Sequence, residues 1–162
     1  MGVLTYPTLE HVAMNARPYP AELLKGCETG LVLFAAAFLG HNDAIHFAEA
    51  GLRTTCIDVD GRRLIEMSAL YPDDWLFLQW DAWKFADASY AKGMSWDVVS
   101  ADTFSGDAMR RSLDSFELWC SLAHKVVTAT YVAGEAYEVP DGWQGSLFER
   151  ATNVYWLVLE RT

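Results

Sequence analysis

The chain has 162 residues, of which 52% are hydrophobic and 14% aromatic. This length and composition favour one folded domain with a sizeable core and exclude the intrinsically disordered class. The net charge is −10, with 22 acidic residues against 12 basic ones. Non-specific binding of nucleic acid depends on Lys and Arg that neutralise phosphates, so we expect no nucleic acid as a partner.

The three cysteines, Cys27, Cys56 and Cys120, are odd in number and lack paired spacing. They predict neither a disulfide framework nor a zinc site, and the four histidines do not show metal-ligand spacing either, so no metal is expected. A reduced, cytoplasmic setting fits best. The opening MGVLTY has no basic region before an apolar core, which argues against a secretion signal, and the apolar run 31–40 is too short to span a bilayer.

The first 30 residues contain Pro7, Pro18 and Pro20 and predict one or two short helices that cover the sheet edge. A buried strand is expected at 31–36, followed by a turn that ends near Gly40 and an amphipathic helix from about 43 to 49. The polar run 41–43 is interpreted as the cap of this helix, with contact to a ligand as the alternative.

The remaining chain alternates between strand and helix patterns. Strands are predicted from Thr54 to the acidic residues Asp58 and Asp60, and at 75–80, 96–102, 125–132 and 153–161. Helices are predicted at 61–71 and 83–93, and a long amphipathic segment spans 106–124. The stretch 134–151 contains Pro140 and reads as a loop, so the final strand is expected to be antiparallel to its neighbour.

This alternation predicts an α/β fold, a three-layer Rossmann-like sandwich with a mostly parallel sheet and an antiparallel C-terminal strand. We expect residues 1–162 to form a single domain, with residues 1–30 as an N-terminal helical cover. Right-handed crossovers then bring the carboxyl ends of the parallel strands to one rim, where ligands bind in such folds.

Acidic residues follow three successive predicted strands: Asp58 or Asp60, then Asp81, then Asp102. On one rim, the first can accept both hydroxyls of a ribose, the second the exocyclic amine of adenine, and the third can face a reacting group. Each of them can also be an ordinary helix cap or turn residue. The set therefore predicts a nucleotide-type site, with capping as the alternative for each member.

The segments VLFAAAFLG, TTCIDVD, LFLQWDAW and WDVVSADTF resemble class I S-adenosylmethionine-dependent methyltransferases over about 31–131. The resemblance implies S-adenosylmethionine as cofactor and methyl transfer as activity. It assigns Asp58 or Asp60 to the ribose, Asp81 to the adenine and Asp102 to the substrate side as the catalytic candidate. The other implied cofactor-binding residues are Ala36, Phe38 and Gly40 in the first loop, and Ala82 and Trp83 beside Asp81.

The first loop departs from the family pattern, because Phe34 stands near a position that is usually acidic, and Ala36 and Phe38 stand where glycines are common. This departure leaves a second interpretation open: a catalytically inactive methyltransferase-like domain that binds a partner or regulates it. A dinucleotide-binding fold fits less well, since the G-x-G-x-x-G pattern is absent.

The segment ADTFSG is unlike the loops of enzymes that methylate DNA bases, and the chain has no inserted substrate domain. A small-molecule acceptor, or a site completed by a second subunit, is therefore expected, with Tyr131 as a second residue lining the site. The Trp-rich, apolar composition is also compatible with a homodimer.

Overall fold

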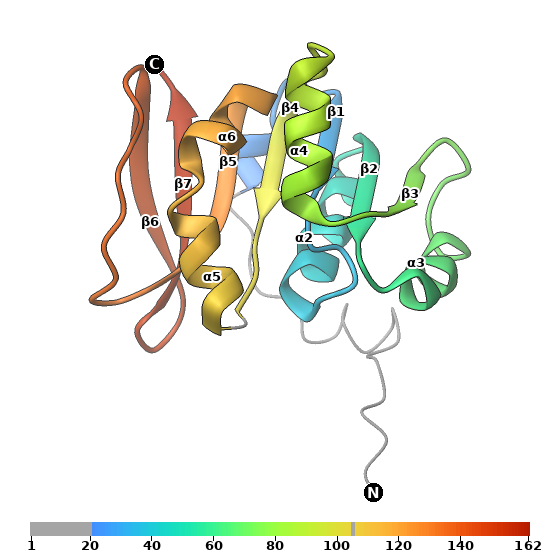
Figure 1. Ribbon diagram of the computed structural model, residues 1–162, viewed down its shortest axis with the longest axis horizontal. Helices are drawn as coiled ribbons and strands as arrows, with labels where there is room; N and C mark the ends of the chain where they lie inside the picture. The colour runs from blue at the N-terminus through green and yellow to red at the C-terminus, as the bar shows by residue number, and fades with distance from the viewer. Residues whose placement is uncertain (1–20, 105) are drawn as a thin grey trace, which may run out of the picture.

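A computed structural model describes residues 21–104 and 106–162, and Figure 1 shows its arrangement. The elements in chain order are η1 (Ala21–Leu24), β1 (Thr29–Val32), α2 (Phe38–Glu49), β2 (Arg53–Asp58), α3 (Gly61–Ser68), β3 (Leu76–Gln79), α4 (Ala82–Ala91), β4 (Trp96–Ala101), α5 (Gly106–Leu113), α6 (Phe116–Leu122), β5 (Ala123–Val132), β6 (Trp143–Ala151) and β7 (Val154–Arg161). Of the predicted N-terminal cover, the described residues include the 3-10 helix η1, and the part before it lies outside the described residues.

The sheet has seven strands in the order β3-β2-β1-β4-β5-β7-β6. The pairs from β3 to β5 are parallel, whereas β7 is antiparallel to both of its neighbours, β5 and β6. The predicted fold class and the antiparallel final strand are thereby confirmed. The prediction of a loop over 134–151 is wrong in its second half, because β6 pairs with β7 along Trp143–Ala151.

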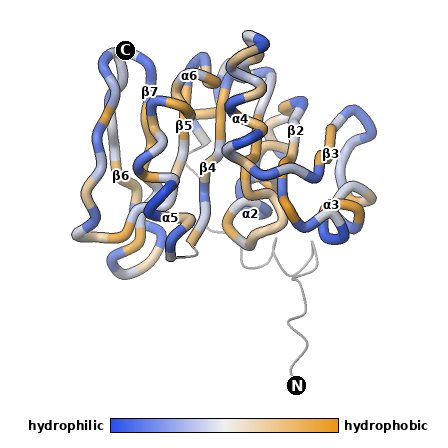
Figure 2. Tube along the Cα trace, viewed as in Figure 1, coloured by the Kyte–Doolittle hydropathy of each residue, from blue (hydrophilic) through white to orange (hydrophobic). Residues whose placement is uncertain are grey.

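Two hydrophobic clusters lie on opposite faces of the sheet. One packs α4, α5 and α6 against inward residues such as Val99, Val127 and Leu157. The other packs α2 and α3 against Val98, Val126 and their neighbours on the second face. Figure 1 shows α4 and α5 in front of the sheet, and Figure 2 shows hydrophobic stretches along the central strands. The three-layer arrangement follows because the central strands are apolar on both sides.

Local signals explain where several helices begin and end. The carboxylates of Asp60 and Asp81 cap α3 and α4, each accepting a bond from a backbone amide in the first turn. The helix α4 ends before Gly93, whose φ of 71° lies in the left-handed region that glycine adopts without strain. The predicted long segment after β4 is two helices, with a break at 114–115. No described helix is long and apolar enough to serve as a membrane span.

Candidate functional site at the carboxyl ends of the parallel strands

The site is built where β1, β2, β3 and β4 end on the same edge of the sheet. The parallel registers place Val32 beside Cys56 on one side and beside Ser100 on the other. The polypeptide continues from these ends into the turn 33–37, Val59–Asp60, Trp80–Asp81 and Asp102–Phe104. In Figure 1 this edge is at the bottom, where α2 and α5 begin. The predicted acidic residues are therefore delivered to one rim.

Asp58 joins the end of β2 to the turn after β1. One oxygen of its carboxylate accepts a bond of 2.9 Å from the backbone amide of Ala36, and the other accepts one of 2.9 Å from the amide of Asp60. Burial raises the pKa of Asp58, while the bonds from the two backbone amides act in the opposite direction. Three of the residues assigned to the cofactor, Ala36, Asp58 and Asp60, are thus in direct contact.

Asp60 and Asp81 serve as helix caps at the rim, which is the alternative role that the sequence left open. Asp60 accepts from the amide of Arg63 at 3.1 Å and forms an ion pair with its side chain. Asp81 accepts from the amide of Lys84 at 3.0 Å through Oδ1. Because a carboxylate has about four acceptor positions on its two oxygens, capping leaves acceptor capacity for a ligand. Capping and ligand binding are compatible at both positions.

The predicted start of the first main helix is wrong. The helix α2 begins at Phe38, so that Gly40 lies inside it and His41, Asn42 and Asp43 are buried within it rather than at its cap. The reason lies in Gly40, where a Cβ atom would be 2.0 Å from the carbonyl oxygen of Phe34. Gly40 therefore permits close approach of the helix to the turn after β1, and the turn itself is only 33–37.

Trp83, assigned to the adenine side, is held by contacts from several elements. Its ring packs edge-on against Phe34 at 5.4 Å between centroids, and the guanidinium of Arg111 lies 4.0 Å above it. Its Nε1 donates a hydrogen bond of 2.9 Å to the hydroxyl of Ser115, while the neighbouring Ala82 is buried. The ring is thereby fixed as a wall between the turn after β1 and the helix α5.

Three exposed apolar side chains at the rim were not identified from the sequence. Val59 after β2, Trp80 after β3 and Phe104 after β4 have exposed fractions of 65%, 41% and 54%. The signal was their position, since each is within two residues of one of the aspartates already singled out. Apolar and aromatic surface beside carboxylates suits a ligand that carries both a flat ring and hydrogen-bond donors.

Asp102, the catalytic candidate, lies fully buried behind this rim. It contacts Arg150 at 3.4 Å, and the hydroxyl of Thr130 donates to it at 3.3 Å. Arg150 also reaches Asp43 at 3.5 Å, and Asp43 accepts a bond of 2.7 Å from Ser100. Burial, followed by the charge of Asp102, raises the pKa of Asp43 well above its usual range, against the opposing charge of Arg150. Neither Asp43 nor Arg150 was assigned to this cluster from the sequence.

Tyr131, the second residue expected to line the acceptor site, lies at the end of β5 and is half-buried. Its ring packs edge-on against Tyr137 at 5.2 Å and lies 6.2 Å from the ring of Tyr155. Within residues 21–104 and 106–162, no group of three or more His, Cys, Asp or Glu is arranged to hold a metal ion.

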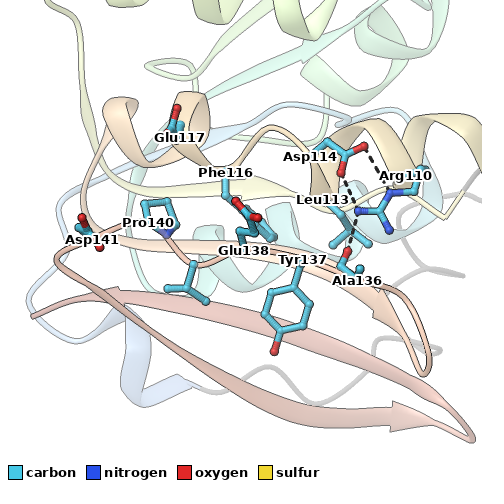
Figure 3. A pocket seen from close by; sticks show the side chains of 11 residues that line it. Arg110, Leu113, Asp114, Phe116, Glu117, Ala136, Tyr137, Glu138, Pro140 and Asp141 are labelled. Atoms are coloured by element: carbon cyan, nitrogen blue, oxygen red, sulfur yellow. Dashed lines mark hydrogen bonds and ion pairs between the residues drawn. The ribbon is translucent and has the colours of Figure 1, made fainter.

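A cavity of about 710 Å³ opens on the face covered by α5 and α6, beside the connection from β5 to β6 (Figure 3). At one end Arg110 binds Glu135 and Asp114, each at 2.7 Å, and donates to the carbonyl of Ala136 at 2.6 Å. Phe116 and Tyr137 contribute aromatic surface to its wall. This cavity was not foreseen, because its walls come from two separate segments, 110–117 and 136–141, that the fold brings together.

Comparison with solved structures identifies the fold. No family model and no curated protein match the sequence. Among solved structures, the chain is similar to an S-adenosylmethionine-dependent methyltransferase from Neisseria gonorrhoeae, with a TM-score of 0.67 and 15% identity over 98% of this chain and 75% of that one. It is also similar to magnesium protoporphyrin IX methyltransferase from Synechocystis, solved with bound S-adenosylmethionine, with a TM-score of 0.58 and 14% identity over 95% and 79%. A methyltransferase from Agrobacterium tumefaciens matches with a TM-score of 0.53 and 11% identity over 94% and 60%. The chain therefore has the class I methyltransferase fold.

Proposed function

We propose that this protein is an S-adenosylmethionine-dependent methyltransferase that acts on a small-molecule acceptor. The observation that carries the proposal is the convergence of Asp58, Asp60 and Asp81 on one rim, beside the exposed side chains of Val59 and Trp80. The fold alone does not specify a function, whereas carboxylates that alternate with apolar surface fit a nucleoside.

The cofactor-binding residues of this proposal follow the order of the strands. The backbone of the turn and first helical residues, at Ala36, Phe38 and Gly40, would lie under the methionine part. Asp58 orients the turn, and Asp60 has acceptor capacity for the ribose hydroxyls. Next to them, Asp81 would accept from the adenine amine, flanked by Ala82 and Trp83.

The cofactor, when bound, supplies a methyl group on a sulfonium sulfur. The contribution of the protein is then mostly to position donor and acceptor, which in well-oriented intramolecular reactions is worth roughly 7–11 kcal/mol. Asp102 is fully buried at the end of β4, two residues before the exposed Phe104, and it would orient the acceptor indirectly, by holding the segment that carries Phe104. The acidic net charge favours a small molecule over a nucleic acid as the acceptor.

Calorimetric titration with S-adenosylhomocysteine, the product form of the cofactor, tests the proposal directly. We expect saturable binding by the wild-type protein. Absence of binding at millimolar ligand would overturn the methyltransferase assignment and leave the inactive, partner-binding interpretation.

Variants of Asp81 separate its two roles. Asp81→Ala removes both the cap and the acceptor, so affinity should fall roughly tenfold to a hundredfold, the equivalent of about 1–3 kcal/mol for a buried donor left unpaired. Asp81→Ser keeps a good cap but has a shorter side chain. We expect it to restore stability without restoring affinity. The matched control is Asp87→Ala, an exposed position on the same helix. If Asp81→Ala, Asp81→Ser and Asp87→Ala all bind the ligand with equal affinity, Asp81 does not contribute to the site.

A further inference from the structure

The buried cluster behind the rim contains two carboxyl groups and one guanidinium. Asp43 lies on α2, Asp102 follows β4, and Arg150 lies on β6, and the side chains of all three are at most 2% exposed. Arg150 is 107 residues from Asp43 and 48 from Asp102 in sequence, so the cluster ties three distant parts of the chain together. Of these three residues, only Asp102 has a part in the proposed function.

The charges in this cluster do not balance if every group is ionised. Two carboxylates against one guanidinium leave one negative charge without a partner in the protein interior, which is strongly unfavourable. The geometry gives a second reason, because Nη2 of Arg150 lies 3.5 Å from Oδ1 of Asp43 and 3.4 Å from Oδ2 of Asp102, so both carboxyl groups meet at one guanidinium nitrogen. Two ionised carboxylates that share a buried site repel each other, and a proton on one of them removes this repulsion.

We propose that Asp43 and Asp102 share one proton in the folded protein and that Arg150 neutralises the remaining negative charge, so that these side chains form a proton-binding site that couples the docking of β6 to pH. The site holds Arg150+ and a single negative charge, and its net charge is zero. Loss of the shared proton adds a buried negative charge next to β4 and weakens the folded state.

The surroundings of the cluster support this balance. Ser100 on β4 and Thr130 on β5 contribute neutral hydroxyls, and the Arg150 guanidinium lies 3.9 Å above the ring of Trp156 on β7. The other titratable groups of α2 are His41, His46 and Glu49, of which the last two pair with each other. Burial lowers the pKa of His41 to about 4, so it is neutral where the shared proton matters.

The pH dependence has a definite sign. The pKa of Asp43 is raised in the folded protein, so above the usual range of Asp the folded state holds a proton that the unfolded state has released. The stability that this proton contributes is lost as the pH rises from about 4 toward the folded pKa. The folding equilibrium constant then decreases by up to about tenfold per pH unit.

Urea unfolding of the full chain between pH 5 and 8 tests the proposal with isosteric variants. Asp43→Asn mimics the protonated carboxyl and keeps the net charge at zero, so it should fold and lose this tenfold-per-unit component. Asp102→Asn should do the same, because Asp43 then pairs with Arg150. The double variant leaves Arg150 buried with neither carboxylate, and its folding constant should be at least tenfold below that of either single variant. The exposed control Asp87→Asn should keep the wild-type slope.

Infrared spectroscopy of the wild-type protein gives a readout that does not depend on whether a variant folds. In the folded wild-type protein, a protonated carboxyl band should persist as the pH rises beyond the range in which exposed carboxyl groups ionise, and it should be absent in both single variants at the same pH. Absence of this band in the wild type, or an Asp43→Asn slope equal to that of the wild type, would overturn the proposal. Because neither measurement uses a methyl donor, the outcome is distinct from that of the cofactor titration.

Discussion

The carboxylate of Asp58 lies 2.9 Å from the backbone amide of Ala36, so that the last residue of β2 holds the turn that follows β1. The same carboxylate accepts from the amide of Asp60 at 2.9 Å. One side chain thereby fixes both loops that flank the proposed cofactor site. Position 58 is therefore an organiser of the site whether or not it touches a ligand.

Replacement of Asp58 should damage stability and binding together. In Asp58→Ala, two backbone amides lose their acceptor, and an unsatisfied partly buried donor costs about 1–3 kcal/mol of the free energy of unfolding. We expect urea unfolding to show a decrease of that size in the free energy of unfolding, with loss of S-adenosylhomocysteine binding because the turn is released. Asp58→Asn keeps one acceptor oxygen, so its stability and its affinity should lie between those of the wild type and Asp58→Ala. Wild-type stability in Asp58→Ala would show that the two bonds contribute nothing.

Gly40 should tolerate no side chain. A Cβ atom there would be 2.0 Å from the carbonyl oxygen and 2.6 Å from the carbonyl carbon of Phe34, and both of these atoms belong to the backbone. Gly40→Ala therefore has to move α2 away from the turn, and overpacking of this kind costs about 1–3 kcal/mol or more.

The control for Gly40 is Gly106→Ala, at the start of α5, where no atom lies within 4 Å of the added Cβ. Alanine is favoured over glycine in a helix by up to about 1 kcal/mol, so this variant should be neutral or stabilising. Thermal unfolding of both variants measures the difference. Equal effects would mean that the contact with Phe34 relaxes without cost.

The parts of the fold that the sequence predicted share a strong local signal. The strand β2 was predicted as an apolar run that begins at Thr54 and ends in acidic residues, and α3 and α4 follow aspartates that were recognised as potential caps. The strand β6 was missed because it is an edge strand with mostly exposed residues, contains Gly145, and depends on pairing with β7. The partner strand β7 is near in sequence, but the residues of β6 do not alternate between apolar and polar side chains.

The site was predictable only as far as neighbouring residues define it. The aspartates at the ends of β2 and β3 are local features, and the parallel sheet brings them to the same rim. Arg150 was not predictable, since nothing in residues 134–151 indicates that its side chain crosses the face of β7 to reach Asp43 and Asp102. The start of α2 was misplaced because Gly40 resembled a turn residue, whereas it is needed for packing inside the helix.

Arg110 should hold the connection between β5 and β6 without contributing much to global stability. Its guanidinium binds Glu135, Asp114 and the carbonyl of Ala136, yet the side chains of the three ionic residues are 36–66% exposed. Exposed pairs of this kind contribute about 0.2–1 kcal/mol each, because solvent screens them. In Arg110→Met we therefore expect a small change in the urea midpoint but faster amide hydrogen exchange at 133–142.

The matched control for Arg110 is Arg62→Met, which removes a more exposed pair with Glu66 on α3. It should leave exchange at 133–142 unchanged. If Arg110→Met also leaves exchange there at the wild-type rate, the connection is held by its aromatic contacts at Tyr137 instead.

His41 should make the protein sensitive to acid. Burial lowers its pKa to about 4 in the folded protein, whereas an unfolded chain titrates near 6.5. Between these values the unfolded state binds a proton that the folded state lacks, so stability falls as pH decreases from about 6.5 to about 4, by roughly 3 kcal/mol in total.

The Asp43 proton acts with the opposite sign above pH 4, so the wild-type curve alone does not separate the effect of His41 from that of Asp43. The difference between wild type and His41→Gln isolates the histidine, and the exposed His124→Gln serves as control. Urea midpoints at half-unit pH steps should show His41→Gln losing the acid-side decline that His124→Gln retains; parallel curves for all three proteins would show that His41 does not stay neutral in the folded state.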